Sequence, residues 1–377
     1  MDPRLSETET AFRDLVRREA SSIGVAADDI DQGVTTAASA IGRLATANIL
    51  GICAPETHGG GGAGPVELAL ASEEVGAVSA SVGVVAVGHM VSSFLLDILG
   101  TPTQRQKWLP AAVEGQTLLA LVLDCGGSLL ESPSCGVSGK KEADRLYLDG
   151  RARAVTGSTL ADFLIVPVKV GDTLLLAVVD ADRNGVTVGI EAGQLGLNGA
   201  GQAPVEFSGV QVPSGSTLST GNVVETMKMA DDLFRIGHAG LCVGIGRAAL
   251  EASTAHVSGV NDELCREQSV QWMLADMATE TEAARLLTWY AASRTSPGEM
   301  REAAPMARLL AADAAVRGSR SAVQIFGPAG NERGSGIERL YRDAKAMEIY
   351  HGAVEVQRLA VAGELLPRLA KDISPWQ

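Results

Sequence analysis

The stretch that decides the fold lies near the C-terminus and reads "RLYRDAKAMEIYHGAVEVQRLAVAGELL", Arg339–Leu366. Its central part, "IYHGAVEVQ", contains a histidine, His351, as the candidate reactive side chain. The other histidines have no partner at i, i+4 and no metal-ligand spacing, so we expect them to pack within helices: His58, His89, His238 and His256. We predict no metal site, and the question of chemistry centres on His351.

The composition is that of an acidic protein with an ample core. Asp and Glu number 45 against 31 Lys and Arg, which gives a formal net charge of -14. A phosphate backbone requires clustered cations, so we do not expect nucleic-acid binding. Hydrophobic residues make up 46% of the 377 residues, enough to bury the core of one large domain or of several smaller ones.

The N-terminus and the cysteines favour a cytoplasmic protein. The first residues, "MDPRLSETETAFRDLVRREA", are acidic and amphipathic, unlike a signal or transit peptide. The most apolar run, Ser81–Gly100, approaches membrane-spanning length but contains His89 and Asp97, so we predict a buried helix and no membrane association. The five cysteines are scattered, which favours reduced thiols.

The sequence pattern changes twice along the chain. Residues 1–120 have apolar positions at helical spacing, as in "GPVELALASEEVGAV", and residues 223–377 return to long helical patterns. Between them, residues 121–222 contain short β-type runs such as "DFLIVPVKVGDTLLLAVVD", separated by turn signals. We therefore predict an N-terminal helical domain (1–120), a middle β domain (121–222) and a C-terminal helical bundle (223–377).

Several motifs follow one another in the order of a known superfamily. The N-terminal part carries "LGICAPETHGGGGAG", "EE" at Glu73–Glu74 and "GTPTQRQKWLPAAVEGQ". The C-terminal part carries "QSVQWMLADM", "QIFGPAG" and the stretch quoted at the outset. The chain thus resembles the acyl-CoA dehydrogenase superfamily over nearly its whole length. The resemblance implies an α+β fold with an α-helical domain, a β-barrel-like middle domain and a C-terminal four-helix bundle.

The resemblance also implies where the reaction takes place. In that superfamily FAD lies between the β domain and the bundle, a neighbouring subunit completes the site, and a carboxylate takes the α-proton of an acyl thioester. The base position of "I-Y-E-G-T" falls on His351, and the alternative position, immediately before Arg235, is Phe234. We predict His351 as the catalytic residue and Phe234, Arg235 and Tyr350 as substrate contacts. Arg342 and Asp343 are expected to form ion pairs at a helix surface or an interface.

Only part of the superfamily's flavin positions is retained. The retained positions, which we predict to contact FAD, are Ser128, Thr156, Gln268, Gln324, Gly327 and Gly352. Ala154 replaces the tryptophan that covers the flavin, Val257 the arginine that contacts the pyrophosphate, Pro328 a glycine and Ala353 a threonine. Loss of the arginine alone forfeits a charge-assisted hydrogen bond of about 1.5–3 kcal/mol. We expect FAD to bind, but more weakly than in the superfamily.

Four functions follow from these observations. The first is an FAD-dependent, dehydrogenase-like oxidoreductase that acts on an acyl thioester of CoA or of a carrier protein, with His351 as base, since a neutral imidazole is a competent base near neutral pH. The second is a catalytically silent partner subunit of a hetero-oligomeric acyl-CoA dehydrogenase. A flavin monooxygenase and a non-redox acid–base enzyme on the same fold are further alternatives. We expect a homo- or hetero-oligomer, a dimer or tetramer, formed with a family member.

Overall fold

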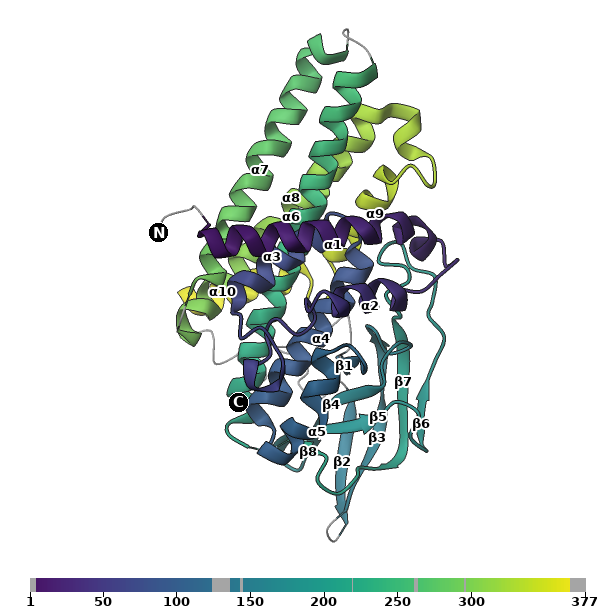
Figure 1. Ribbon diagram of the computed structural model, residues 1–377, viewed down its shortest axis with the longest axis vertical. Helices are drawn as coiled ribbons and strands as arrows, with labels where there is room; N and C mark the ends of the chain where they lie inside the picture. Colours follow the sequence, from purple (N-terminus) through teal and green to yellow (C-terminus); the bar gives the residue numbers. More distant parts are fainter. Residues whose placement is uncertain are drawn as a thin grey trace.

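The computed structural model describes residues 5–123, 136–142, 145–218, 220–260, 264–294 and 296–366. Helices occupy both ends of the chain and a β-sheet region lies between them (Figure 1). The long helices α6 (Val223–Val260), α7 (Gln268–Ala292) and α8 (Pro297–Phe326) run beside one another and project away from the sheet. This arrangement confirms the predicted α+β fold class.

The N-terminal part consists of helices, several of which begin at a side-chain N-cap. They are α1 (Glu7–Asp31), α2 (Ala38–Thr46), the short 3-10 helix η1 (Glu56–His58), α3 (Pro65–Gly76), α4 (Ala80–Leu99) and α5 (Pro102–Val113). The hydroxyls of Ser6 and Thr101 accept backbone N–H groups at the starts of α1 and α5. By length and composition α4 could cross a membrane, yet 78% of its apolar window is buried inside the protein. The prediction of a buried helix is therefore confirmed.

The middle part forms an eight-stranded sheet in the order β6-β7-β3-β2-β4-β5-β8, with β1 paired to β4. The strands are β1 (Leu119–Leu121), β2 (Val137–Glu142), β3 (Arg145–Val155), β4 (Phe163–Val170), β5 (Thr173–Asp180), β6 (Val186–Val188), β7 (Ala203–Gln211) and β8 (Thr217–Leu218). Side chains such as Leu148, Val166 and Val205 form a core that belongs to the sheet. The chain enters the sheet from α5 through β1, which also packs against α4 and so connects the sheet to the helices.

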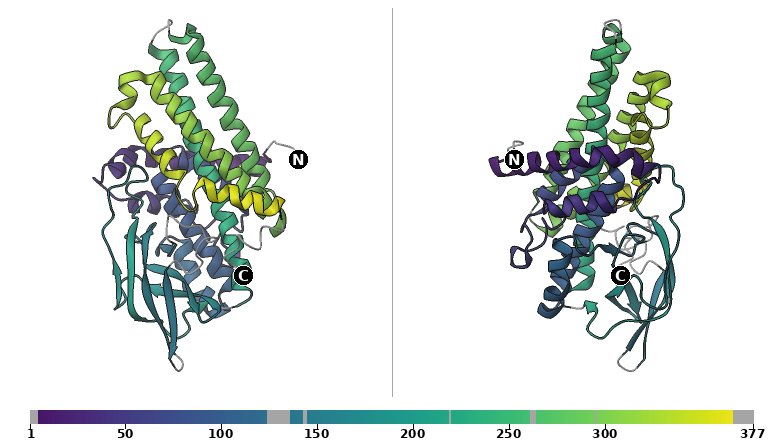
Figure 2. Two further views of the ribbon diagram at one scale, coloured as in Figure 1. Left: turned by 180° about the vertical axis from the view of Figure 1, so that it is seen from behind. Right: turned by 45° about the vertical axis from the view of Figure 1, so that its right-hand side comes forward.

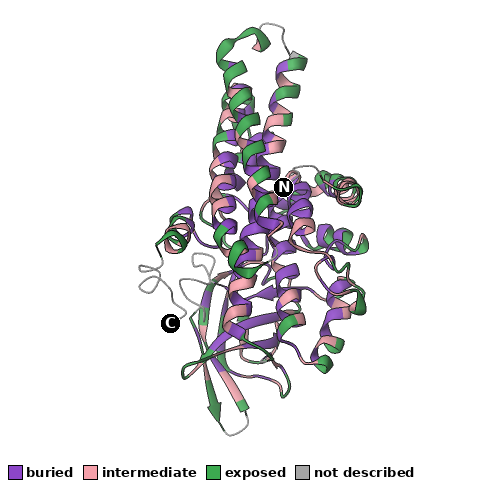
Figure 3. Ribbon diagram, turned by 90° about the vertical axis from the view of Figure 1, so that its left-hand side faces the viewer, coloured by how far each residue is buried: buried purple, intermediate pink, exposed green. Residues whose placement is uncertain are grey.

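The C-terminal part continues beyond the three long helices. The short helices η2 (Leu264–Arg266) and η3 (Gly327–Asn331) follow α6 and α8, and the last helices of the described residues are α9 (Ile337–Met347) and α10 (Val354–Leu365). The left view of Figure 2 shows α10, in yellow, lying across the bundle to one side of the sheet, where it packs against α8. The helices are buried where they cross the centre of the molecule and exposed towards the far ends of α6 and α7 (Figure 3).

Glycines allow α6 to pass close to α3. A Cβ atom at Gly244 would lie 2.3 Å from the carbonyl oxygen of Glu73, and one at Gly240 would lie 2.7 Å from that of Ala69. Real Cβ atoms do not come so near to backbone atoms, so side chains at these positions would force the helices apart. The small residues of the sequence therefore have a packing role along this contact.

The buried "EE" pair joins α3 to three other helices. Glu74 lies 2.9 Å from Arg17 of α1 and 2.6 Å from Arg247 of α6. Glu73 lies 3.3 Å from Arg247 and 3.1 Å from Arg285 of α7. Burial raises the pKa of Glu73 above its ordinary value, although both arginines lower it. The pair therefore has a structural role, because each carboxylate connects separate helices.

Polar contacts within the chain fix α9. Arg342 lies 2.6 Å from Asp31 of α1, and its Nη1 donates to the carbonyl of Leu195 at 3.0 Å. Asp343 accepts the backbone N–H of Leu197 at 2.7 Å. Both side chains are buried, which places their contacts inside the chain rather than at its surface. The start of the turn that carries His351 is thereby held in position.

Candidate active site

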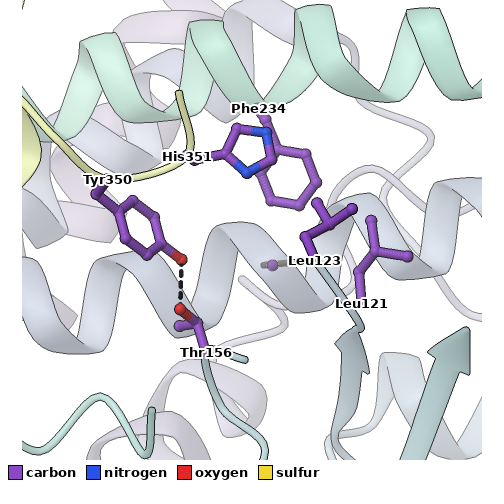
Figure 4. Close-up of a pocket in the computed structure, with 7 residues that line it drawn as sticks. Leu121, Leu123, Thr156, Phe234, Tyr350 and His351 are labelled. Atoms are coloured by element: carbon purple, nitrogen blue, oxygen red, sulfur yellow. Dashed lines mark hydrogen bonds between the residues drawn. The ribbon is translucent and has the colours of Figure 1, made fainter. Parts of the chain in front are cut away.

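A small pocket lies where the N-terminal helices, the sheet and the C-terminal part meet (Figure 4). It is lined by Gly88 of α4, Leu121 and Leu123 at the end of β1, Thr156 after β3, Phe234 of α6, and Tyr350 and His351 between α9 and α10. The free space is about 20 Å³, room for about one water molecule. The fold thus brings together four of the residues that the sequence assigned to catalysis, substrate and flavin.

His351 lies in a turn with left-handed backbone conformation. The φ angle is 51° at His351 and 84° at Gly352. Positive φ is uncommon for residues other than glycine, although histidine tolerates it better than most. The His351 side chain is 5% exposed. Residues held in such sparsely populated conformations occur often at functional sites, which agrees with the position of His351 at the pocket.

Asp231 of α6 is the acidic neighbour of His351, and the sequence analysis missed it. Its Oδ1 lies 3.3 Å from Nε2 of His351, the distance of an ion-pair contact rather than of a short hydrogen bond. Its Oδ2 lies 2.5 Å from Arg235, four residues further along the helix. Burial would raise the pKa of Asp231, but Arg235 and His351 together lower it below its ordinary value. Asp231 is therefore a buried carboxylate directed at the histidine.

Arg235 lies behind His351 and does not line the described pocket. Its guanidinium donates to Asp232 at 2.7 Å and to the side-chain oxygen of Gln357 at 2.9 Å. The Gln357 amide in turn donates to the carbonyl of Gly352 at 3.1 Å. Burial, assisted by Asp231, raises the pKa of Asp232 to about 7 against the opposing effect of Arg235. Arg235 thus ties α6 to α10 and to the turn, and its role as a substrate contact stays a prediction.

Tyr350 and two buried basic residues complete the surroundings. The Tyr350 hydroxyl donates to Oγ1 of Thr156 at 2.7 Å (Figure 4). The ring of His238 lies 5.1 Å from that of Tyr350 and 5.3 Å from that of His351. Burial lowers the pKa of His238 well below its ordinary value, with smaller effects of His351 and Arg308, so this ring is neutral. Arg308 donates to the carbonyl of Tyr350 at 3.3 Å and supports the turn from behind.

The predicted flavin contacts fall in separate places. Thr156 lines the pocket, and Gly352 adjoins His351. Gln324 lines a second groove, between α7 and α8. Gln268 is exposed at the start of α7, and Gly327 ends α8 with a φ of 59°. Ser128 lies outside the described residues. Of the predicted flavin residues that the structure describes, Thr156 and Gln324 thus line two different parts of the chain, the pocket at His351 and the groove between α7 and α8.

The available donors fit FAD, although not at every predicted position. Val257 is 4% exposed and packs in the core, so no cation is offered there. Arg320 lines the same groove as Gln324 and makes no ion pair with the described residues, whereas Arg317 lies 2.8 Å from Glu280. A guanidinium beside an amide suits a phosphate group, because both donate hydrogen bonds to anionic oxygens. Arg320 is thus a candidate replacement for the missing pyrophosphate arginine.

Comparison with known proteins decides the family. The family described as "Acyl-CoA dehydrogenase, N-terminal domain" matches residues 6–116, and "Acyl-CoA dehydrogenase, C-terminal domain" matches residues 225–366. An acyl-CoA dehydrogenase of Bacillus subtilis is 32% identical over 365 residues, which cover 94% of this chain and 96% of that protein. The chain belongs to the acyl-CoA dehydrogenase family.

The solved acyl-CoA dehydrogenases support the same assignment. Butyryl-CoA dehydrogenase from Megasphaera elsdenii matches with a TM-score of 0.87 and 26% identity, covering 97% of this chain and 100% of that one. Members of the acyl-CoA dehydrogenase family bind FAD and acyl-CoA substrates. The fold alone does not define the reaction: dibenzothiophene monooxygenase from Paenibacillus sp. A11-2 matches with a TM-score of 0.83 at 19% identity, covering 95% of this chain and 97% of that one. The reaction must therefore be argued from the pocket.

Proposed function

We propose that this protein is an FAD-dependent oxidoreductase that acts on an acyl thioester, of CoA or of a carrier protein, with His351 as the general base. The observation that carries the proposal is the buried imidazole of His351 at the pocket, in contact with the Asp231 carboxylate. FAD, when bound, supplies the hydride acceptor. The protein's own residues bind the thioester, exclude water and remove the α-proton.

The pocket suits proton abstraction because much of its wall beside His351 is apolar. Phe234 lies ring to ring with His351 at 4.2 Å, and Leu121 and Leu123 also line the pocket. Water exclusion strengthens electrostatic interactions inside such a site. An imidazole beside a carboxylate can accept a proton and remain stabilised as the cation. Thr156 is the residue that we propose to contact the flavin from the sheet side.

The test starts with the purified protein. We expect bound FAD, and anaerobic addition of a suitable acyl thioester should bleach the oxidised flavin. His351→Gln should abolish bleaching, whereas His256→Gln should leave it unchanged, because His256 stacks on Phe326 and does not line the pocket. A flavin-loaded His351→Gln variant whose flavin is reduced at the wild-type rate would exclude His351 as the base. Failure of the wild-type protein to bind FAD would exclude the proposed oxidoreductase function.

The alternative is a partner subunit whose catalytic base and flavin contacts come from another family member. Two observations favour it: the pocket holds only about 20 Å³, and Val257 is packed in the core. On α7, Trp272 and Tyr290 are 62% and 42% exposed, which suits burial against a second subunit. Co-expression with candidate family members distinguishes the two functions, since this alternative requires flavin and activity only in the mixed oligomer. We further propose a cytoplasmic dimer or tetramer.

A further inference from the structure

The two ring nitrogens of His351 lie in different surroundings. Nε2 lies 3.3 Å from Oδ1 of Asp231 on α6. Figure 4 shows the other nitrogen, Nδ1, on the opposite side of the ring, directed towards the interior of the pocket and away from α6. The Phe234 ring packs at 4.2 Å and restricts rotation of the imidazole. The site therefore distinguishes one nitrogen from the other.

The position of the Asp231 carboxylate does not depend on His351. Asp231 is 2% exposed, and its Oδ2 lies 2.5 Å from Arg235, which is itself held by Asp232 and Gln357. An ionised carboxylate has acceptor atoms and no proton to give. The ring nitrogen of His351 that faces this carboxylate is therefore more stable with a proton than without one.

The other ionisable groups around the ring do not compete for this proton. His238 is neutral because burial lowers its pKa well below the ordinary value, and its ring lies edge-on to His351. Arg308 is directed to backbone carbonyls of the turn, and the Tyr350 hydroxyl donates to Thr156. Among the described residues, Asp231 is the ion-pair partner of Nε2.

We infer that Asp231 is a positioning residue: it holds the neutral His351 ring with its proton on Nε2, so that Nδ1 is the nitrogen that takes the α-proton of the substrate. The inference rests on the proposed function. As the Cα–H bond breaks, its electron pair stays on the acyl thioester and the proton passes to Nδ1. The resulting imidazolium then faces the Asp231 anion, which stabilises it.

Asp231→Asn tests the role because it keeps the shape of the side chain and removes its charge. Arg235 can donate only to the amide oxygen, so the amide N–H groups turn towards Nε2 of His351. Nε2 then becomes an acceptor, and the proton moves to Nδ1, the nitrogen that should stay free. In serine proteases the corresponding change of tautomer lowers kcat by about 10⁴. Asp232→Asn is the matched control, since Asp232 also contacts Arg235 but forms no ion pair with His351.

Two measurements on the holoenzyme test the role of Asp231. Nitrogen chemical shifts of histidine-labelled protein identify the tautomer, with the His351 signal assigned by its absence in His351→Gln. The anaerobic rate of flavin reduction by an acyl thioester measures the reaction. We expect the wild type and Asp232→Asn to carry the proton on Nε2. Asp231→Asn should carry it on Nδ1 and reduce flavin roughly 10²- to 10⁴-fold more slowly, with little change in KM.

The outcomes separate this inference from the proposed function. An Asp231→Asn variant in which His351 keeps its proton on Nε2, or in which flavin is reduced at the wild-type rate, would overturn the role of Asp231. The proposed function would be unaffected by that result. If His351 of the wild-type protein carries its proton on Nε2 but no acyl thioester reduces the flavin, the proposed function is wrong. The inferred tautomer would still hold. If Asp231→Asn does not fold, Asp231→Glu keeps the charge and should keep the Nε2 proton; a proton on Nδ1 in that variant would also overturn the inference.

Discussion

Replacing His351 with glutamate would restore the residue type that the superfamily carries at the base position, yet we expect the single substitution to fail. The new carboxylate would face Asp231, whose Oδ1 lies 3.3 Å from the present Nε2. At an effective dielectric constant of about 20, two like charges about 4 Å apart repel by about 4 kcal/mol, or about 3 pKa units. Arg235, 2.5 Å from Asp231, offsets part of this repulsion. We expect this repulsion to raise the glutamate pKa by about 2 units, and burial at a position where His351 is 5% exposed to raise it by roughly 2 units more, to about 8.

A glutamate that is largely protonated at neutral pH cannot accept the α-proton. His351→Glu combined with Asp231→Asn removes the repelling charge. In FAD-loaded protein the double variant should therefore reduce flavin about 10-fold faster than the single variant near neutral pH, and the difference should narrow as the pH rises. The assay is anaerobic stopped-flow bleaching of the oxidised flavin by one acyl thioester across a range of pH.

The matched control combines His351→Glu with Asp232→Asn, which retains Asp231 and should behave like the single variant. Equal rates for the single and the Asp231→Asn double variant at every pH would refute the reasoning, because the repulsion would then have no effect. A single variant that is fully active at neutral pH would refute it as well.

The remaining predictions concern stability and flavin affinity. Burial lowers the pKa of His89 to about 4. The protein therefore has its full stability above the unfolded-state pKa of this histidine and loses about 3 kcal/mol as the pH falls through the folded-state pKa. His89→Gln should make the urea-unfolding midpoint depend less on pH between these two pKa values. Glu74→Gln should destabilise the protein by about 1–3 kcal/mol in urea unfolding, because Arg247 loses one of its two buried carboxylate partners and keeps Glu73. Gly244→Ala should destabilise by about 1–3 kcal/mol, whereas Gly318→Ala, where a Cβ meets nothing within 4 Å, should be neutral or stabilising; thermal unfolding compares them. Arg320→Ala should weaken FAD binding by roughly 10- to 100-fold in a fluorescence titration, and unchanged affinity would exclude Arg320 from the flavin site.

The fold was predictable because its information is local. Each motif of the acyl-CoA dehydrogenase family occupies a short stretch, and the motifs occur in the expected order, so the sequence identified helices, sheet and bundle. The same local motif located His351 and Tyr350 at the pocket, and the structure places Phe234 and Thr156 beside them.

The partners of His351 were not predictable in the same way, because they come from distant segments. Arg235 and Gln357 are separated by 122 residues, and their hydrogen bond exists only once α6 and α10 have packed together. The i, i+4 spacing of Asp231 and Arg235 is visible in the sequence, but it reads as an ordinary helix ion pair until the turn with His351 is placed against it. The small volume of the pocket likewise depends on side chains from several segments.

The left-handed turn at His351 and Gly352 bears on how this protein family can diversify. The His351 side chain extends from a short connection, while α9 and α10 on either side are secured by other residues, among them Arg342 through Asp31 and Gln357 through Arg235. A mutation in the connection can therefore exchange this side chain while the helices keep their places. Natural selection can then vary the side chain at this position at little risk to folding, and a histidine where the motif of the resemblance has glutamate is the kind of variation that such an architecture permits.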